Sequence, residues 1–173
     1  MTGYIPSEIN RLRNLKVLIL EDNNLFGTLP QGLWTLKTVY KIGLSKNKLT
    51  GLIPSSIGDL QLLEVLGLYH NSLTGLIPSS IGNLGKLLYL ELYNNFLTGS
   101  IPSSIGSLEN LHYLVLYDNS LTGSILSSIG KLGQLQFLGL YDNFFTGSIP
   151  LSIAFNGSIP SSIGNIFNSM AIL

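Results

Sequence analysis

The sequence predicts a solenoid built from stacked coils of 24 residues, and two observations support this prediction. Glycine recurs every 24 residues without a slip, at Gly3, Gly27, Gly51, Gly75, Gly99, Gly123 and Gly147. An isoleucine or leucine follows two residues after each glycine, and a proline comes next in every repeat except the one with Leu126. Such strict internal repetition is typical of solenoids, in which each coil contacts only its neighbours.

The rest of each repeat follows the pattern L-x-x-L-x-L-x-x-N-x-L, as in Leu15, Leu18, Leu20, Asn23 and Leu25. The middle of this pattern alternates with period two, which indicates a strand with one buried face, and Gly and Pro mark the return path. One coil cannot bury its own leucines. Stacking the coils would bury them in a continuous core.

This pattern, together with the L-x-G-x-I-P segment at Leu73, Gly75, Ile77 and Pro78, resembles the plant-type leucine-rich repeat family. The resemblance extends over about residues 2–150 and is greatest to the extracellular arrays of plant receptor kinases and receptor-like proteins. It implies an α/β solenoid, a right-handed superhelix of 24-residue repeats. Each coil would carry a strand of a concave parallel β-sheet, often a second short strand near the I-P segment, and a short helical or 3₁₀ turn outside.

We expect one array over residues 1–173, with a half repeat at 1–12 and six regular repeats over about 13–156. An irregular truncated repeat and a C-terminal half coil would occupy about 151–173, because a second G-S-I-P motif begins at Gly157, only 10 residues after Gly147. Family ectodomains usually have Cys-paired caps, whereas this chain has no cysteine. These features suggest an internal fragment, a truncated gene product or a damaged copy of a larger receptor-like protein.

Composition argues against several functions. Nine Lys+Arg balance nine Asp+Glu, so we expect no nucleic-acid partner, which would require clustered excess cations. The absence of cysteine removes thiolate chemistry, and we expect no cofactor and no metal. The first residues contain no apolar run typical of a signal peptide, and Pro150 and Pro160 interrupt the uncharged C-terminal stretch, so we expect no membrane span in this chain.

One asparagine per coil is expected to be structural. A buried turn leaves backbone N–H and C=O groups that need partners, and an amide side chain supplies both donors and an acceptor. We therefore predict an internal ladder made of Asn23, Asn47, Asn71, Asn95, Asn119 and Asn143.

Alternation places other residues on the open concave face. One column ends in Tyr69, Tyr93, Tyr117 and Tyr141, and another ends in Tyr89, Tyr113 and Phe137. Two interpretations remain open and can coexist. The aromatics form a ligand-binding surface, since Tyr combines a large contact area with a hydroxyl, or they stack on one another and stabilise the sheet.

A third column adds His70, Asp118 and Asp142 as candidate polar contacts to a ligand. Asp118 and Asp142 could form a carboxylate pair for acid–base chemistry or for a cation, but such residues more often cap the turn after a strand. His70 and His112 have no third ligand within reach, so no metal site is expected. The repeated Ser-Ser-Ile-Gly stretches could also template an ice lattice.

These observations favour a non-enzymatic recognition module with no catalytic residues. The resemblance implies a peptide or protein ligand, or a co-receptor, bound on the concave face at the extracellular side of the plasma membrane or in the apoplast. A serine/threonine kinase domain of a parent protein would signal, and its motifs are missing from this chain. Asn156 is a candidate glycosylation site. The alternatives are a secreted defence protein similar to polygalacturonase inhibitors and a non-functional truncated product.

Overall fold

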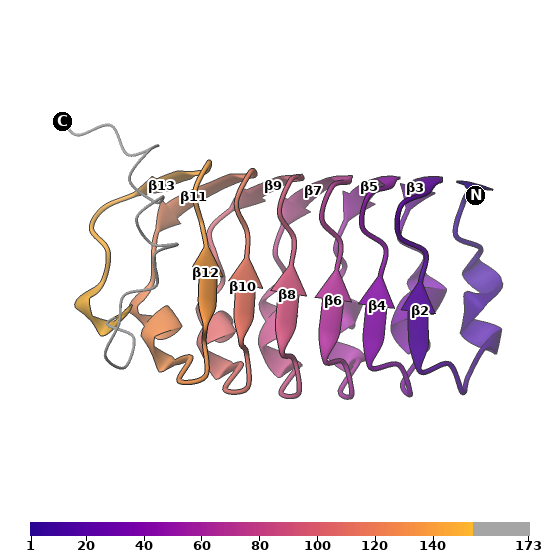
Figure 1. Cartoon of the computed structure of the whole chain (residues 1–173), viewed down its shortest axis with the longest axis horizontal. Coiled ribbons are helices and arrows are strands. Elements are labelled where there is room, and N and C mark those ends of the chain that lie inside the picture. Colours follow the sequence, from indigo (N-terminus) through magenta and orange to yellow (C-terminus); the bar gives the residue numbers. More distant parts are fainter. Residues whose placement is uncertain (154–173) are drawn as a thin grey trace.

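The structure is a computed structural model that describes residues 1–153, and its coils stand side by side in one row (Figure 1). Each coil contributes one strand to a concave, six-stranded parallel sheet, whose strand order is β12-β10-β8-β6-β4-β2. These strands are β2 (Val17–Ile19), β4 (Lys41–Gly43), β6 (Val65–Gly67), β8 (Tyr89–Glu91), β10 (Tyr113–Val115) and β12 (Phe137–Gly139). The alternating leucine segment therefore forms the strand that the sequence predicts.

A second parallel sheet of seven strands runs along the neighbouring side of the row, in the order β1-β3-β5-β7-β9-β11-β13. It consists of β1 (Thr2–Gly3), β3 (Asn24–Thr28), β5 (Lys48–Leu52), β7 (Ser72–Leu76), β9 (Phe96–Gly99), β11 (Ser120–Ser124) and β13 (Phe144–Thr146). Its glycines have φ between +72° and +124°, a region open to Gly at little steric cost. A Cβ on Gly75 would also overlap the end of the Leu52 side chain, so at this position the absence of a side chain adds to the need for a positive φ.

A 3₁₀ turn closes each coil on the outer side. These turns are η1 (Ser7–Arg11), η2 (Gln31–Thr35), η3 (Ser55–Asp59), η4 (Ser79–Asn83), η5 (Ser103–Ser107), η6 (Ser127–Lys131) and η7 (Leu151–Ile153). Proline precedes η1 to η5 in an extended conformation, with φ between −78° and −67°. The ring fixes such a φ before the turn begins, and Leu126 adopts it without a ring before η6.

The two sheets differ in register. Residues 24 apart are partners in the concave sheet, as in Tyr89 with Tyr113, so its columns are rows of direct neighbours. In the second sheet the partners are 22 apart, as in Thr74 with Phe96. The register changes from 24 to 22 residues at the asparagine that lies between the two sheets. There the Leu73 N–H donates to Asn95 Oδ1, which is 22 residues further along the chain. A 24-residue column of the second sheet is therefore staggered by two residues at each step.

The space between the two sheets and the 3₁₀ turns is filled by leucine and isoleucine. Leu66, Leu90 and Leu114 are fully buried on adjacent concave strands, and they belong to one cluster that extends from Ile5 to Ile153. Trp34 replaces the glycine of other turns and is also buried. Within the described residues, no helix is long and apolar enough to cross a membrane.

The asparagines join each coil to both neighbours. Asn95 Nδ2 donates to the Leu92 carbonyl of its own coil and to the Leu68 carbonyl of the preceding coil, both at 3.1 Å. Its Oδ1 accepts the Leu73 N–H at 2.9 Å. Asn71, Asn119 and Asn143 repeat this arrangement, and all four are buried. Without the amides, polar backbone groups at the turn would lie buried without partners.

We predict that Asn95→Ala lowers the free energy of unfolding by about 3 kcal/mol, because it leaves the buried Leu73 N–H unpaired and removes one of the two amide donors from the Leu68 and Leu92 carbonyls. Urea unfolding followed by circular dichroism measures this. Asn110→Ala is the matched control, because Asn110 is exposed and donates one hydrogen bond, to the Gly85 carbonyl. Equal losses in the two variants would contradict the structural role of the ladder.

Candidate functional site

The concave sheet presents a tyrosine ladder, which we define as Tyr69, Tyr93, Tyr117 and Tyr141. Consecutive rings are stacked, with centroids 4.5, 4.5 and 4.3 Å apart and planes inclined by 5°, 24° and 10°. These separations are close to the spacing of neighbouring strands. All four side chains are half-buried, so they lie neither in the core nor apart from one another.

A second aromatic row lies at the other edge of the same strands. Tyr89 and Tyr113 stack at 5.1 Å, and Tyr113 and Phe137 at 5.9 Å. Their interplanar angles are 22° and 18°, and Tyr89 remains 37% exposed. The seven aromatics predicted for the concave face thus form two parallel rows that start at β8 and at the end of β6.

The stacking limits what these rings can offer a ligand. The faces of Tyr93 and Tyr117 are covered on both sides by ladder neighbours, so a partner meets ring edges and hydroxyl groups. Ring edges carry partial positive charge and prefer carbonyl oxygens or the faces of other rings. Mutual stacking, one of the two open interpretations, is present, and it leaves a fixed row of edges available for binding.

The third column follows the ladder at the turn out of the sheet. Its six residues have φ between 51° and 56°, the left-handed region: Asp22, Lys46, His70, Asn94, Asp118 and Asp142. Asn and Asp tolerate this region better than most residues, which explains their presence by backbone geometry. Asp118 and Asp142 are exposed, and Asp118 accepts a hydrogen bond from Asn94 Nδ2 at 3.4 Å. His70 packs its ring against the edges of Tyr69 and Tyr93.

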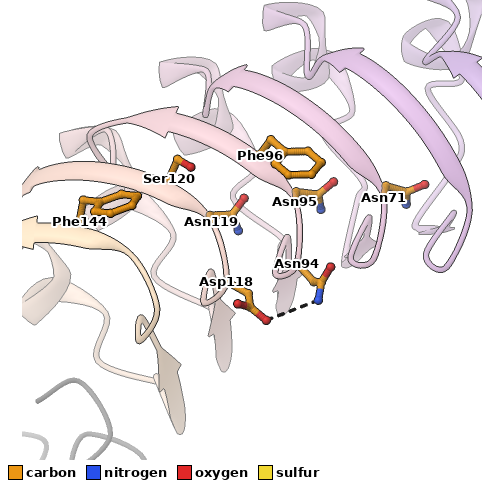
Figure 2. A pocket seen from close by; sticks show the side chains of 8 residues that line it. All are labelled: Asn71, Asn94, Asn95, Phe96, Asp118, Asn119, Ser120 and Phe144. Atoms are coloured by element: carbon orange, nitrogen blue, oxygen red, sulfur yellow. Dashed lines mark hydrogen bonds between the residues drawn. The ribbon is translucent and has the colours of Figure 1, made fainter. Parts of the chain in front are cut away.

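A shallow groove of about 280 Å³ lies where the chain turns from the concave sheet into the second sheet (Figure 2). Its polar side is formed by Asn94 and Asp118, and its apolar side by Phe96 and Phe144. Asn71, Asn95, Asn119 and Ser120 complete the lining. Among the residues predicted to bind a ligand, Asp118 lines this groove. Within residues 1–153, no group of three or more His, Asp or Glu side chains could hold a metal.

Sequence reasoning missed the row that runs between the two aromatic rows. This central row consists of Ile19, Gly43, Gly67, Glu91, Val115 and Gly139. Glu21 and Ser45 precede Tyr69 in the ladder column, and the Glu21 carboxylate lies over Gly43. The signal in the sequence is glycine at outward-facing strand positions, where a side chain is expected. The candidate Asn156 lies outside the described residues.

Burial and neighbouring charge change the acidity of three groups on this face. Burial raises the pKa of the Glu91 carboxyl above its ordinary value, and repulsion from Glu21 raises it further, while Lys41 offsets part of the effect. Burial also raises the pKa of the Tyr117 and Tyr93 phenols, with added contributions from Tyr141 and Tyr69 respectively. The environment of the concave face therefore penalises the charged form of each of these three groups relative to its neutral form.

Two family models match the chain. The model described as a leucine-rich repeat region matches residues 41–145, and the model described as a leucine-rich repeat matches residues 14–36. The matched segments include the concave strands β4 to β12 and β2, together with all seven aromatics of the two rows. The comparison with curated protein sequences gave no match.

Solved structures of plant receptor ectodomains are similar to this chain. The ectodomain of the Arabidopsis thaliana receptor kinase GASSHO1/SCHENGEN3, in complex with CASPARIAN STRIP INTEGRITY FACTOR 2, has 42% identity and a TM-score of 0.86. The plant peptide hormone receptor RGFR1 in complex with RGF2 has 40% identity and a TM-score of 0.87. The Arabidopsis receptor kinase HAESA with an IDA peptide hormone ligand has 36% identity and a TM-score of 0.85.

These matches cover 87%, 88% and 87% of this chain but only 18%, 24% and 25% of the respective receptor chains. The chain thus spans about a quarter or less of the ectodomains that it resembles.

We predict that Tyr117 and Tyr93 ionise at higher pH than a free phenol. The unfolded chain loses these protons near pH 10, while the folded chain retains them. The free energy of unfolding therefore falls as pH rises above about 10. Absorbance at 295 nm during a pH titration measures phenolate formation, and Tyr117→Phe should remove part of the late step. A single transition near pH 10, equal to that of the urea-unfolded chain, would contradict the prediction.

We predict that Glu91→Gln stabilises the protein at neutral pH. Because the folded chain has the higher pKa, it holds the Glu91 proton after the unfolded chain has lost it, and stability falls as pH rises through this window. The gain at pH 7 should be at most about 1 kcal/mol, since the carboxylate is partly exposed and screened. It should vanish near pH 4. Urea unfolding at both pH values tests this, with the exposed Glu109→Gln as control. A loss of stability at pH 7 would refute it.

Proposed function

This chain belongs to the leucine-rich repeat family, and we propose that it is a non-enzymatic recognition module whose concave face binds an extended peptide or a protein partner. The observation that carries the proposal is the tyrosine ladder. Four rings are held at 4.3–4.5 Å intervals by their own stacking, half-exposed on the open face of a rigid sheet. A partner that binds them does not need to order them first.

The energetic argument rests on this preorganisation. Association loses free energy for each flexible side chain that must be fixed, about 0.5–1.5 kcal/mol for a residue with many rotamers. Ladder tyrosines are already fixed, so little is lost on binding. Their hydroxyls can donate to and accept from a peptide backbone, while the ring edges contact carbonyl oxygens or apolar side chains. The second row, Tyr89 to Phe137, would flank the same ligand.

The comparisons support the class of partner. One similar chain is described as the ectodomain of a plant receptor kinase in complex with CASPARIAN STRIP INTEGRITY FACTOR 2, and another as a plant peptide hormone receptor in complex with RGF2. HAESA is described in complex with a peptide hormone and, in a second structure, also with the co-receptor SERK1. By analogy, this module would bind its ligand or a co-receptor at the extracellular face of the plasma membrane or in the apoplast. His70 and Asp118, at the rim beyond the ladder, would contribute polar contacts, and Asp142 would do so near its last ring.

We predict that replacing both Tyr93 and Tyr117 by Ala weakens peptide binding at least about 100-fold, because two aromatic hot-spot residues are lost from the centre of the surface. Random peptides displayed on phage are selected on the full chain, and the affinity of the enriched peptides is then measured by fluorescence anisotropy. Circular dichroism should show an unchanged sheet content.

The control is Phe26→Ala, which removes a 39% exposed aromatic from β3 of the second sheet, outside the groove, and should leave affinity unchanged. The double Tyr→Phe variant separates stacking from hydroxyl contacts. Enriched peptides that bind the Tyr→Ala variant as well as the unaltered chain would refute the proposal.

A further inference from the structure

We propose that the N-terminal end of the tyrosine ladder is a subsite for an organic cation, the guanidinium or ammonium group of an arginine or lysine in the bound partner. The inference deepens the proposed function and rests on it for the identity of the ligand as a peptide. We call this place the cation notch and define it by Glu21, Ser45, Gly67, Tyr69 and Glu91.

The floor of the notch is backbone. Gly43 and Gly67 are register partners on β4 and β6, two strands that lie side by side (Figure 1), and both belong to the central row of the concave face. Any side chain there would occupy the concave surface between the column of Lys41 and Val65 and the column of Ser45 and Tyr69. A Cβ on Gly43 would overlap the Glu21 carboxylate, so this glycine allows Glu21 to reach across β4 from the neighbouring coil.

Three side-chain oxygens converge above Gly67. Measured from the position that a Cβ on Gly67 would occupy, Ser45 Oγ lies at 3.0 Å, Glu21 Oε1 at 3.6 Å and Glu91 Oε2 at 3.7 Å. The three residues come from three different coils, so the arrangement is not a local turn motif. It exists because the stacked coils place Glu21 and Ser45, which follow β2 and β4, and Glu91 on β8 within reach of Gly67 on β6.

Ser45 supplies an independent sign of a ligand. Its side chain is fully buried, and its hydroxyl has no hydrogen-bond partner among the described residues. Buried polar atoms are nearly always paired, and an unpaired hydroxyl costs about 1–3 kcal/mol. A donor bound above Gly67 would pair with this oxygen as well as with the two carboxylates.

The charge balance in the notch also favours a cation. Glu21 and Glu91 repel each other, and Lys41 is the basic side chain that attracts Glu91. Two carboxylates therefore face one ammonium group. In the described part of the chain, the ion pair formed is Lys37 with Asp59 on the outer side, so neither carboxylate has a cation within 4.0 Å. A second positive group would neutralise the remaining charge.

Tyr69 makes an organic cation a better fit than a metal ion. One face of its ring stacks on Tyr93, and its neighbour on the other side along the column is Ser45, which covers little of a ring. Among residues 1–153, no other aromatic ring stacks on this second face, so a guanidinium group bound there would lie against the ring while its N–H groups reach the carboxylates. A metal ion would instead need several more oxygen ligands at close range.

The experiment uses the full chain and a probe that carries only the side chain in question, Nα-acetyl-arginine amide. Backbone amide signals in ¹H–¹⁵N spectra are followed as the probe is added, and we expect saturable shifts at Ser45, Gly67 and Glu91 with a dissociation constant in the millimolar range. The uncharged isostere, Nα-acetyl-citrulline amide, should bind at least about tenfold more weakly, because charge-assisted bonds are lost.

Variants test the residues. Glu21→Gln and Glu91→Gln should each weaken arginine binding about tenfold, and Ser45→Ala should weaken it by a smaller factor. Glu109→Gln, which removes an exposed carboxylate in the turn between η5 and β10, should have no effect. The isosteric Gln variants keep the volume of the side chain and preserve the fold, and Ser45→Ala removes one atom only.

The proposal is overturned if the arginine probe causes no shifts, if citrulline binds equally well, if the Gln variants bind like the unaltered chain, or if Ca²⁺ shifts the same signals while arginine does not. Because the probe has no extended backbone, it does not depend on the ladder binding peptides. If peptide binding requires Tyr93 and Tyr117 but the arginine probe causes no shifts at the notch, the cation notch alone is refuted. If the arginine probe binds at the notch but no peptide is enriched in the selection, the proposed function alone is refuted.

Discussion

The hydrogen bonds of the buried asparagines fix the distance between coils, and the rest of the structure depends on that distance. Each amide bonds to carbonyls of its own and the preceding coil and accepts an N–H from that preceding coil, so no coil can slide or tilt without breaking several buried bonds. The resulting spacing suits planar rings, since parallel aromatic groups also prefer a separation of this order. The tyrosine ladder thus follows from the coil spacing that the asparagine ladder and the backbone hydrogen bonds of the concave sheet set together.

Sequence periodicity predicts the columns well because a column is a property of the repeat. The positions of Gly75, Asn95 and Tyr93 in the coil follow from counting alone. The 22-residue register of the second sheet does not, since it depends on how the backbone turns through the left-handed residue before each asparagine. The cation notch is harder still, because it arises where the repeat is broken by Glu21, Ser45 and Glu91 and where side chains cross from one coil to another. An interpretation based on the repeat gives no role to residues that depart from it, yet these residues distinguish one concave face from another.

The concave face therefore combines parts that stabilise the array with parts that weaken it. The ladder rings gain contact with one another, and they stabilise the sheet in the absence of any ligand. Glu91 does the opposite, because its charged form is disfavoured by burial and by Glu21. Ser45 adds an unpaired buried hydroxyl. Destabilising groups of this kind, gathered at one place on an otherwise consistent fold, are expected where a binding site takes precedence over stability.

The two features also impose a direction on an extended ligand. Four ladder rings at the spacing of neighbouring strands extend over about 14 Å, which matches about four residues of extended chain. The notch lies at one end of this row, beside Tyr69, and contains the buried Ser45 hydroxyl, whereas the two carboxylates near the other end, Asp118 and Asp142, are exposed to solvent in the turns after the strands. A peptide with a basic residue next to a short segment that suits ring edges and hydroxyls would fit in one orientation and not in the reverse. The sheet itself is nearly the same in every coil, so orientation must come from the positions where the repeat is broken.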